Sequence, residues 1–260
     1  MNPHQLRGLV LSAVCAGVVC WAESASAAAE VHRFSFVVSA NPTQIDASEF
    51  NKVVIDNLNE TRFGPRGLQG LGRIGFGWFF DTQLRYFVRP NVAVEVGTGQ
   101  LRSITKREYL PRLSAAIQYR AEVLSVPVHA GAAYYLPPYN QGDFQARVYL
   151  GGGFASLVYN RARLQAEEFG TDSLTTLGGS FLLSARGDSP GYYLEAGVHM
   201  FFAARYSVMI GALYRSFMVR RMDGEAILQS TTGPVIVPLG PVFDLDTSGV
   251  GGRFALAIGF

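Results

Sequence analysis

Apolar residues recur at every second position in one segment after another of this 260-residue chain. In "NVAVEVGTG", residues 91–99, Val92, Val94 and Val96 share one face, and small or charged residues occupy the other. This two-residue period is that of a β-strand with one apolar face. No apolar run after residue 27 approaches the roughly 20 residues of a membrane-spanning helix. If the chain enters a membrane, it therefore does so as strands.

The same period is found in further segments. They are residues 32–40, 73–89, 143–154, 191–202, 206–218 and 253–260. In the segment 73–89, the face predicted to point outward begins with Ile74. An eighth segment, 115–136, changes register, because its apolar residues have one parity up to Val123 and the other from Val128. A β-bulge around 125–127 would explain this change, since one extra residue turns every later side chain to the opposite face.

Short and long connections alternate between these segments. Short turns are expected near Pro90, over 137–142 and near Ala204, and long connections over 41–69, 105–113, 161–190 and 221–246. Short turns at one end and long loops at the other are typical of outer-membrane barrels, whose short turns are periplasmic. The pattern predicts an all-β, antiparallel, up-and-down transmembrane barrel of eight strands. A hairpin over 173–187 would make ten.

The first 27 residues have the form of a cleaved export signal. Arg7 precedes an apolar stretch over residues 8–22, and small residues follow up to Ala27, where cleavage is expected. The apolar stretch of about 15 residues is shorter than the roughly 20 that span a bilayer. The barrel domain is therefore expected to comprise residues 28–260.

Composition limits the chemistry of the mature domain. Both cysteines, Cys15 and Cys20, lie in the signal, so neither a disulfide nor a thiolate metal site is expected. Charged residues make up 16% of the chain, and the net charge of +2 is scattered. Without a basic block, nucleic acid is not an expected partner.

With these features, the chain resembles the small outer-membrane β-barrel proteins of Gram-negative bacteria, of the kind represented by OmpW, OmpX and the barrel domain of OmpA. The matching features are the export signal, the unit "LRYFVRPNVAVEVGTG", the strand "VPVHAGAAYYL" ahead of "VYLGGGF", and the terminal "RFALAIGF". The resemblance implies an outer-membrane monomer that contacts the membrane lipids, the assembly machinery and periplasmic chaperones. It also implies that the last strand is a signal read by that machinery. The residues with this expected role are Phe254, Leu256, Ile258 and Phe260.

Charged residues also occur on the face predicted to point into the barrel. They are Arg33, Arg73, Asp81, Arg85, Glu95, Arg147, Glu195, Arg215 and Arg253. Isolated buried charges are costly, whereas a hydrogen-bonded network is tolerated. An eight-stranded barrel is just wide enough for its own side chains. We therefore expect a network that plugs the lumen and leaves no wide ion-conducting pore.

Catalytic and cofactor sites are not expected. His32, His129 and His199 are far apart and have no metal-ligand spacing. His129 and His199 are expected to pack or hydrogen-bond inside the barrel. Glycines 151–153 lie within an alternating strand with no helix after it, so a phosphate loop is not expected there. The chain is therefore predicted to be no enzyme and to hold no metal or cofactor.

Three classes of function remain open. They are a structural or surface-interaction barrel, a narrow OmpW-like channel for small hydrophobic molecules, and a soluble lipocalin-like binder. The apolar stretch "PVIVPLGPVFDL", residues 234–245, would either guide a hydrophobic molecule or extend the neighbouring strands above the membrane. Outward aromatic residues such as Trp78 and Phe80 argue against a soluble protein.

Overall fold

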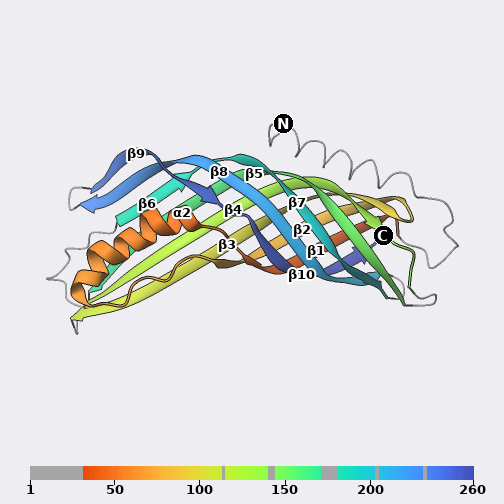
Figure 1. The fold of residues 1–260 in the computed structure, drawn as a ribbon, viewed down its shortest axis with the longest axis horizontal. Helices are drawn as coiled ribbons and strands as arrows, with labels where there is room; N and C mark the ends of the chain where they lie inside the picture. Colours follow the sequence, from red (N-terminus) through yellow and green to blue (C-terminus); the bar gives the residue numbers. More distant parts are fainter. Residues whose placement is uncertain (1–31, 113–114, 140–143, 171–180, 203–204, 231–232) are drawn as a thin grey trace, which may run out of the picture.

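A computed structural model describes residues 32–260 apart from 113–114, 140–143, 171–180, 203–204 and 231–232 (Figure 1). The strands are β1 (Phe34–Gln44), β2 (Phe76–Arg89), β3 (Val92–Arg112), β4 (Ala115–Tyr135), β5 (Gln145–Gly170), β6 (Phe181–Arg186), β7 (Ser189–Phe201), β8 (Tyr206–Ser230), β9 (Gly233–Asp246) and β10 (Gly249–Gly259). A helical region follows β1 and consists of α2 (Ser48–Phe50), η1 (Asn51–Asp56), η2 (Asn59–Phe63) and η3 (Gly64–Arg66). None of the described helices is long and apolar enough to cross a membrane. The predicted signal peptide, residues 1–27, lies outside the described residues.

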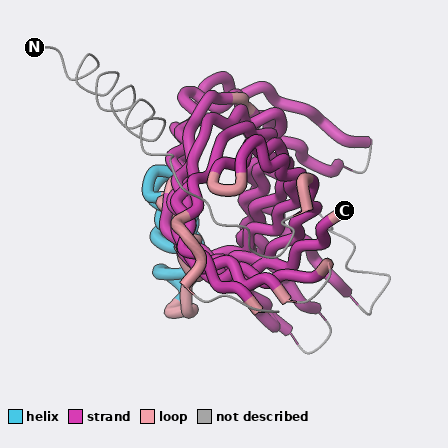
Figure 2. The backbone as a smooth tube through the Cα atoms, turned by 90° about the vertical axis from the view of Figure 1, so that its right-hand side faces the viewer, coloured by secondary structure: helices cyan, strands magenta, loops and turns pink. Residues whose placement is uncertain are grey.

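Eight strands close into an antiparallel ring (Figure 2). β1 to β5 pair in chain order, β5 pairs with β7, β7 with β8, and β8 with β10, which returns to β1. The other two strands do not enlarge the ring. β6 continues the line of β7 between β5 and β8, and β9 continues the line of β10 along β8. The predicted eight-stranded barrel is confirmed. Residues 173–180 of the hairpin that would have made ten strands lie outside the described residues, and its described part, β6, adds no strand to the ring.

Both ends of the described chain lie at the short-turn end of the barrel, on the right of Figure 1. The backbone N–H of Phe260 donates to the carbonyl of Phe34 at 2.9 Å, and the two rings stack at 6.0 Å. The turn at Pro90–Asn91 and the connection after Leu136 lie at the same end. Short turns are periplasmic in outer-membrane barrels, so this is the end that the sequence analysis expects to face the periplasm.

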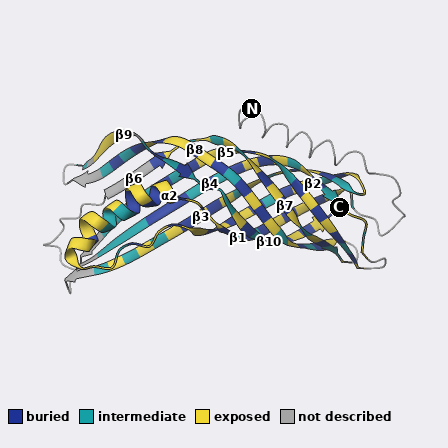
Figure 3. Cartoon of the chain, in the orientation of Figure 1, coloured by how far each residue is buried: buried dark blue, intermediate teal, exposed yellow. Residues whose placement is uncertain are grey.

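In the periplasmic half, side chains alternate between buried and exposed along each strand (Figure 3). In β2, for example, Trp78 and Phe80 are exposed while Phe79 and Asp81 are buried. The exposed apolar residues form the band that faces lipid, as the sequence pattern predicts.

The strands continue well beyond this band, which corrects the predicted long connections. β5 has 26 residues, or about 85 Å of strand at about 3.3 Å per residue, whereas about ten residues cross a bilayer. Most of the predicted connections 105–113, 161–190 and 221–246 is therefore strand, because β3, β4, β5, β6, β8 and β9 keep pairing above the membrane. The stretch 234–245 belongs to β9 and extends the wall along β8.

The change of parity in β4 has a different cause from the predicted bulge. Ala121, Val123, Ser125 and His129 are all buried, so odd-numbered side chains point inward on both sides of the proposed slip. The described bulge lies opposite, at Val158 of β5, where the pairing shifts between Val126 and Pro127. Apolar residues of β4 change face because their surroundings change. In the half near the short turns they face the lipid outside the barrel, and in the other half they face an apolar core inside it.

This upper core, here called the extracellular core, lies between the long strands and the helical region. Its members are buried and apolar, and they include Phe50, Ile55, Phe63, Ile74, Leu157, Val219, Met222, Phe243 and Leu245. The predicted loop 41–69 thus contains helix, because its apolar residues at 50, 54, 55, 58 and 63 follow a helical period. Gly67, with φ of 64°, follows the last helical turn. Ile74, predicted to face lipid, is only 3% exposed because the strand begins two residues later.

Candidate functional site

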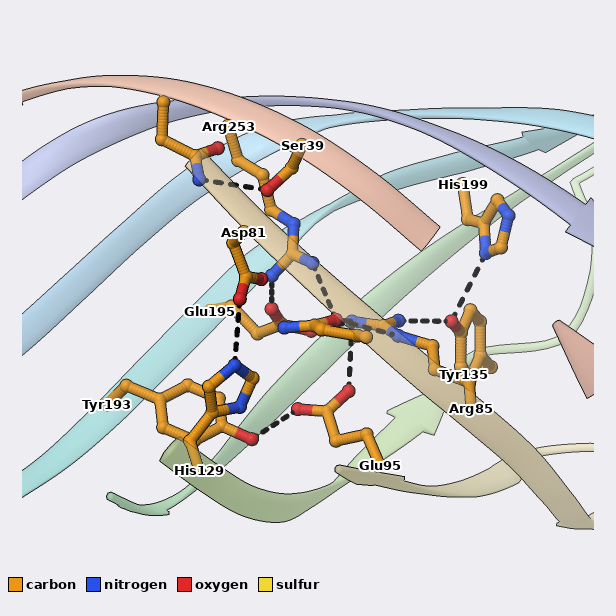
Figure 4. Close-up of polar contacts among 12 residues, drawn as sticks. Ser39, Asp81, Arg85, Glu95, His129, Tyr135, Tyr193, Glu195, His199 and Arg253 are labelled. Atoms are coloured by element: carbon orange, nitrogen blue, oxygen red, sulfur yellow. Dashed lines mark hydrogen bonds and ion pairs between the residues drawn. The ribbon is translucent and has the colours of Figure 1, made fainter. Parts of the chain in front are cut away.

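Inward side chains from four strands meet in the lumen (Figure 4). We call Arg85 of β2, Glu95 of β3, Glu195 of β7 and Arg253 of β10 the central ion cluster. Arg85 Nη2 lies 2.9 Å from Glu95 Oε2 and also contacts Glu195, which pairs in turn with Arg253. All four side chains are 0% exposed. Two positive and two negative charges therefore balance within a few ångströms, as charges this deeply buried require.

Neutral groups satisfy further hydrogen bonds of the central ion cluster. Arg85 Nη1 donates to the Tyr135 hydroxyl at 2.7 Å. Arg253 Nη2 donates to Gln83 Oε1 at 2.7 Å. The Tyr193 hydroxyl donates to Glu95 Oε1 at 2.6 Å. These contacts link strands across the lumen and fix the orientation of each charged group.

A second polar pair lies beside the cluster. His129 Nε2 is 2.8 Å from Asp81 Oδ1, and the His129 ring meets the Tyr193 ring at 5.1 Å. Two glycines leave room for these side chains. A Cβ at position 97 would lie 2.7 Å from the His129 ring, and one at position 131 would lie 2.4 Å from the Tyr193 hydroxyl. Glycine on the inner wall thus makes space for large polar groups.

Two other predicted lumen charges point inward but lie apart from the central ion cluster. Arg215 donates to Thr43 Oγ1 at 2.7 Å, and its guanidinium carbon lies 4.9 Å from the centre of the Phe79 ring. Arg147 donates to the carbonyl of Pro90 at 2.8 Å, next to the β2–β3 turn. Sequence parity placed both on the inner face but could not show that neither joins the cluster.

Arg33 and Arg73 correct the predicted network, because both are exposed. Arg33 precedes the first residue of β1, so it lies at the periplasmic rim. Arg73 precedes β2 and pairs with Asp56 of η1 at 2.8 Å, with 70% of its side chain exposed. This hydrogen bond and the Asp56 charge raise the pKa of Arg73. Both residues share the parity of the inner face, but the strands begin after them.

One contact was missed by the sequence reasoning. His199 Nε2 lies 2.7 Å from Ser207 Oγ, and His199 Nδ1 lies 3.1 Å from the Tyr135 hydroxyl. The β7–β8 connection brings the first pair together, because Phe201 pairs with Ser207 in register. Spacing along the sequence does not reveal this pair, because the two residues lie on different strands. His199 is 0% exposed and Ser207 only 6%, so the pair is buried in the lumen wall.

A small cavity adjoins these groups in the described part of the chain. A cavity of about 10 Å³ lies among Phe79, Pro127, His129, Arg215 and Phe217, which is about the volume that one water molecule needs. Among the described residues, no group of three or more His, Cys, Asp or Glu side chains is placed to hold a metal ion.

The terminal strand carries its expected assembly residues on the outer surface. Their exposed fractions are 54% for Phe254, 66% for Leu256, 46% for Ile258 and 61% for Phe260. In β9, Val235, Ile236, Val237 and Leu239 are also exposed, at the end opposite the short turns. Phe243 differs, because it packs on Phe50 in the extracellular core at 5.3 Å.

Comparisons with known proteins point to one class. The family described as "Outer membrane protein beta-barrel domain" matches residues 11–227. No curated protein matches. Among solved structures, Neisserial surface protein A is similar at 13% identity and a TM-score of 0.41, over 90% of this chain and 100% of that one. The outer membrane protein OprG of Pseudomonas aeruginosa is similar at 14% identity and a TM-score of 0.41, over 87% of this chain and 96% of that one.

Proposed function

Since this chain belongs to the outer membrane protein β-barrel domain family, we propose that it is a closed barrel of the Gram-negative outer membrane with a structural or surface-interaction role. In this role it is a monomer without catalytic activity. The outer-membrane location follows from the family.

The observation that carries the proposal is the complete burial of the central ion cluster. Arg85 and Arg253 are each 0% exposed, so neighbouring side chains cover both groups completely, and their charges are met by Glu95 and Glu195. The extracellular core lies above the cluster and adds a second, apolar obstruction. A narrow channel for hydrophobic molecules would need an apolar path through the lumen, past the central ion cluster and the extracellular core. The charged side chains of the cluster lie where this path would run.

Electrical measurements test this proposal. We expect the purified protein in planar bilayers to give no stable, large single-channel conductance, because eight strands enclose only their own side chains. A heat-modifiability gel on the same preparation establishes that the barrel is folded. Stable conductance steps of porin size from folded protein would overturn the proposal.

A second test concerns the expected assembly signal. We propose that the exposed ring of Phe260 is part of the feature that the assembly machinery binds. Phe260→Ala should lower the amount of folded protein in outer membranes several-fold, whereas refolding of the purified variant in detergent should match the original. Val250→Ala is the matched control, because Val250 is also exposed, at 54%, and lies in β10, the strand that Phe260 directly follows. If both variants lower the amount of folded protein in outer membranes equally, the loss comes from reduced lipid contact, and Phe260 has no special role in assembly.

A further inference from the structure

A group of arginines lies on the outer surface of the wall, above the lipid-facing band. Arg102 of β3, Arg120 of β4, and Arg161 and Arg163 of β5 surround Glu122 of β4; we call these five residues the outer basic cluster. Strand register brings them together. Arg102 is paired with Leu124, which is paired with Arg161, and Glu122 is paired with Arg163.

Glu122 holds three of these arginines in place. Arg102 Nε donates to Glu122 Oε1 at 2.7 Å, and Arg163 Nε donates to Oε2 at 2.8 Å. Arg120 Nη2 lies 3.4 Å from Oε2. Only 2% of the Glu122 side chain is exposed, whereas the exposed fractions are 48% for Arg102, 32% for Arg120 and 21% for Arg163. The carboxylate is therefore covered by guanidinium groups that face outward.

The outer basic cluster carries excess positive charge. Burial raises the pKa of Glu122, but the hydrogen bonds and charges of Arg102 and Arg163 outweigh this effect and lower it. Glu122 is thus ionised at neutral pH, and four arginines against one carboxylate leave a net charge of +3. Arg102, Arg120 and Arg163 each keep exposed side-chain surface beyond their contacts with Glu122. The cluster therefore has both excess positive charge and exposed guanidinium surface for an anion.

Exposed aromatic residues show where the cluster lies relative to the membrane. Trp78, 47% exposed, is paired with Arg102 in register. Tyr159, 38% exposed, lies under the guanidinium of Arg161, whose carbon is 5.9 Å from the ring centre. Exposed Trp and Tyr mark the level of the headgroups in membrane barrels. The cluster is at this level, on the half of the barrel away from the periplasmic turns.

We propose that the outer basic cluster binds the phosphate groups of lipids in the outer leaflet. Guanidinium groups bind phosphate through paired, charge-assisted hydrogen bonds. The lipid-facing band continues directly into the cluster, so a lipid whose acyl chains pack on that band brings its headgroup to these arginines. This lipid contact is independent of whether the lumen conducts.

The test compares two lipids that differ only in phosphate. Purified protein in detergent is incubated with bis-phosphorylated lipid A or with the same lipid after dephosphorylation, and bound lipid is measured by native mass spectrometry. We expect the phosphorylated form to bind at least tenfold more tightly. Arg102→Gln with Arg163→Gln should weaken this binding by about 10- to 30-fold, because each cation near a charged headgroup contributes about a factor of five.

Controls separate this binding from general charge effects. Arg62→Gln with Arg66→Gln removes the same charge from exposed positions of the helical region and should leave binding unchanged. Inorganic phosphate at millimolar concentration should compete weakly, because it lacks the acyl chains. Equal binding of both lipids by the original protein would overturn the proposal without any variant. Equal losses in the two double variants would also overturn it.

Discussion

Arg85→Met should lower the free energy of unfolding by about 3–5 kcal/mol, because it leaves two buried carboxylates without their shared cation. Arg85 contacts both Glu95 and Glu195 and also donates to Tyr135. Unfolding in urea can be followed in lipid vesicles by the fluorescence of Trp78, the only tryptophan of residues 28–260. The unfolding midpoint should fall strongly.

Two further variants make this result specific. Arg73→Met makes the same change in an exposed ion pair and should leave the midpoint nearly unchanged. Arg85→Met with Glu95→Gln removes one whole ion pair and leaves the Arg253–Glu195 pair intact. The double variant should therefore be more stable than Arg85→Met alone. If the three variants lose equal stability, buried charge does not hold the lumen together.

Phe50→Ala should destabilise the extracellular part by about 3–5 kcal/mol, the usual cost of removing a fully buried phenylalanine. Phe50 is 0% exposed and meets Phe243 of β9 edge to face. We expect the helical region to separate from the wall, because this ring joins the two. Limited proteolysis should then cut within residues 45–75, while the periplasmic half of the barrel stays protected.

The matched control is Val53→Ala, three residues away and 41% exposed. It should not change the cleavage pattern. Loss of heat modifiability in Phe50→Ala would mean that the two halves unfold as one unit, contrary to this expectation.

The membrane-crossing half could be predicted from sequence because one rule governs it. Lipid outside and polar groups inside make every strand alternate in the same sense, from Phe36 in β1 to Ile258 in β10. The inward charges Asp81, Arg85, Glu95, Glu195 and Arg253 follow from that parity. Their pairing does not, because partners such as Arg85 and Glu195 lie 110 residues apart and meet only through closure of the ring.

The extracellular half escaped prediction because its rule is the reverse. There water lies outside and the core is apolar, so Ala121 and Val123 point inward where Val128 of the same strand points to lipid. When apolar residues are expected on the outer face only, this reversal resembles a change of register within a strand or a connection between strands. The stretch where the apolar face changes, between Val123 and Val128 of β4, therefore gives the level of the outer membrane surface along that strand.

The helical region also has a consequence for how the protein behaves at the cell surface. Above the membrane, within the described residues, β3 pairs only with β4, and β9 only with β8, so each has one edge without a partner strand. The helical region lies against both: Phe63 stacks on Tyr109 of β3 at 4.6 Å, and Glu49 accepts the backbone N–H of Asp244 in β9 at 3.0 Å. Open edges invite strand addition from other chains. By covering these two edges, the helical region should prevent edge-to-edge association between copies of the protein at the cell surface.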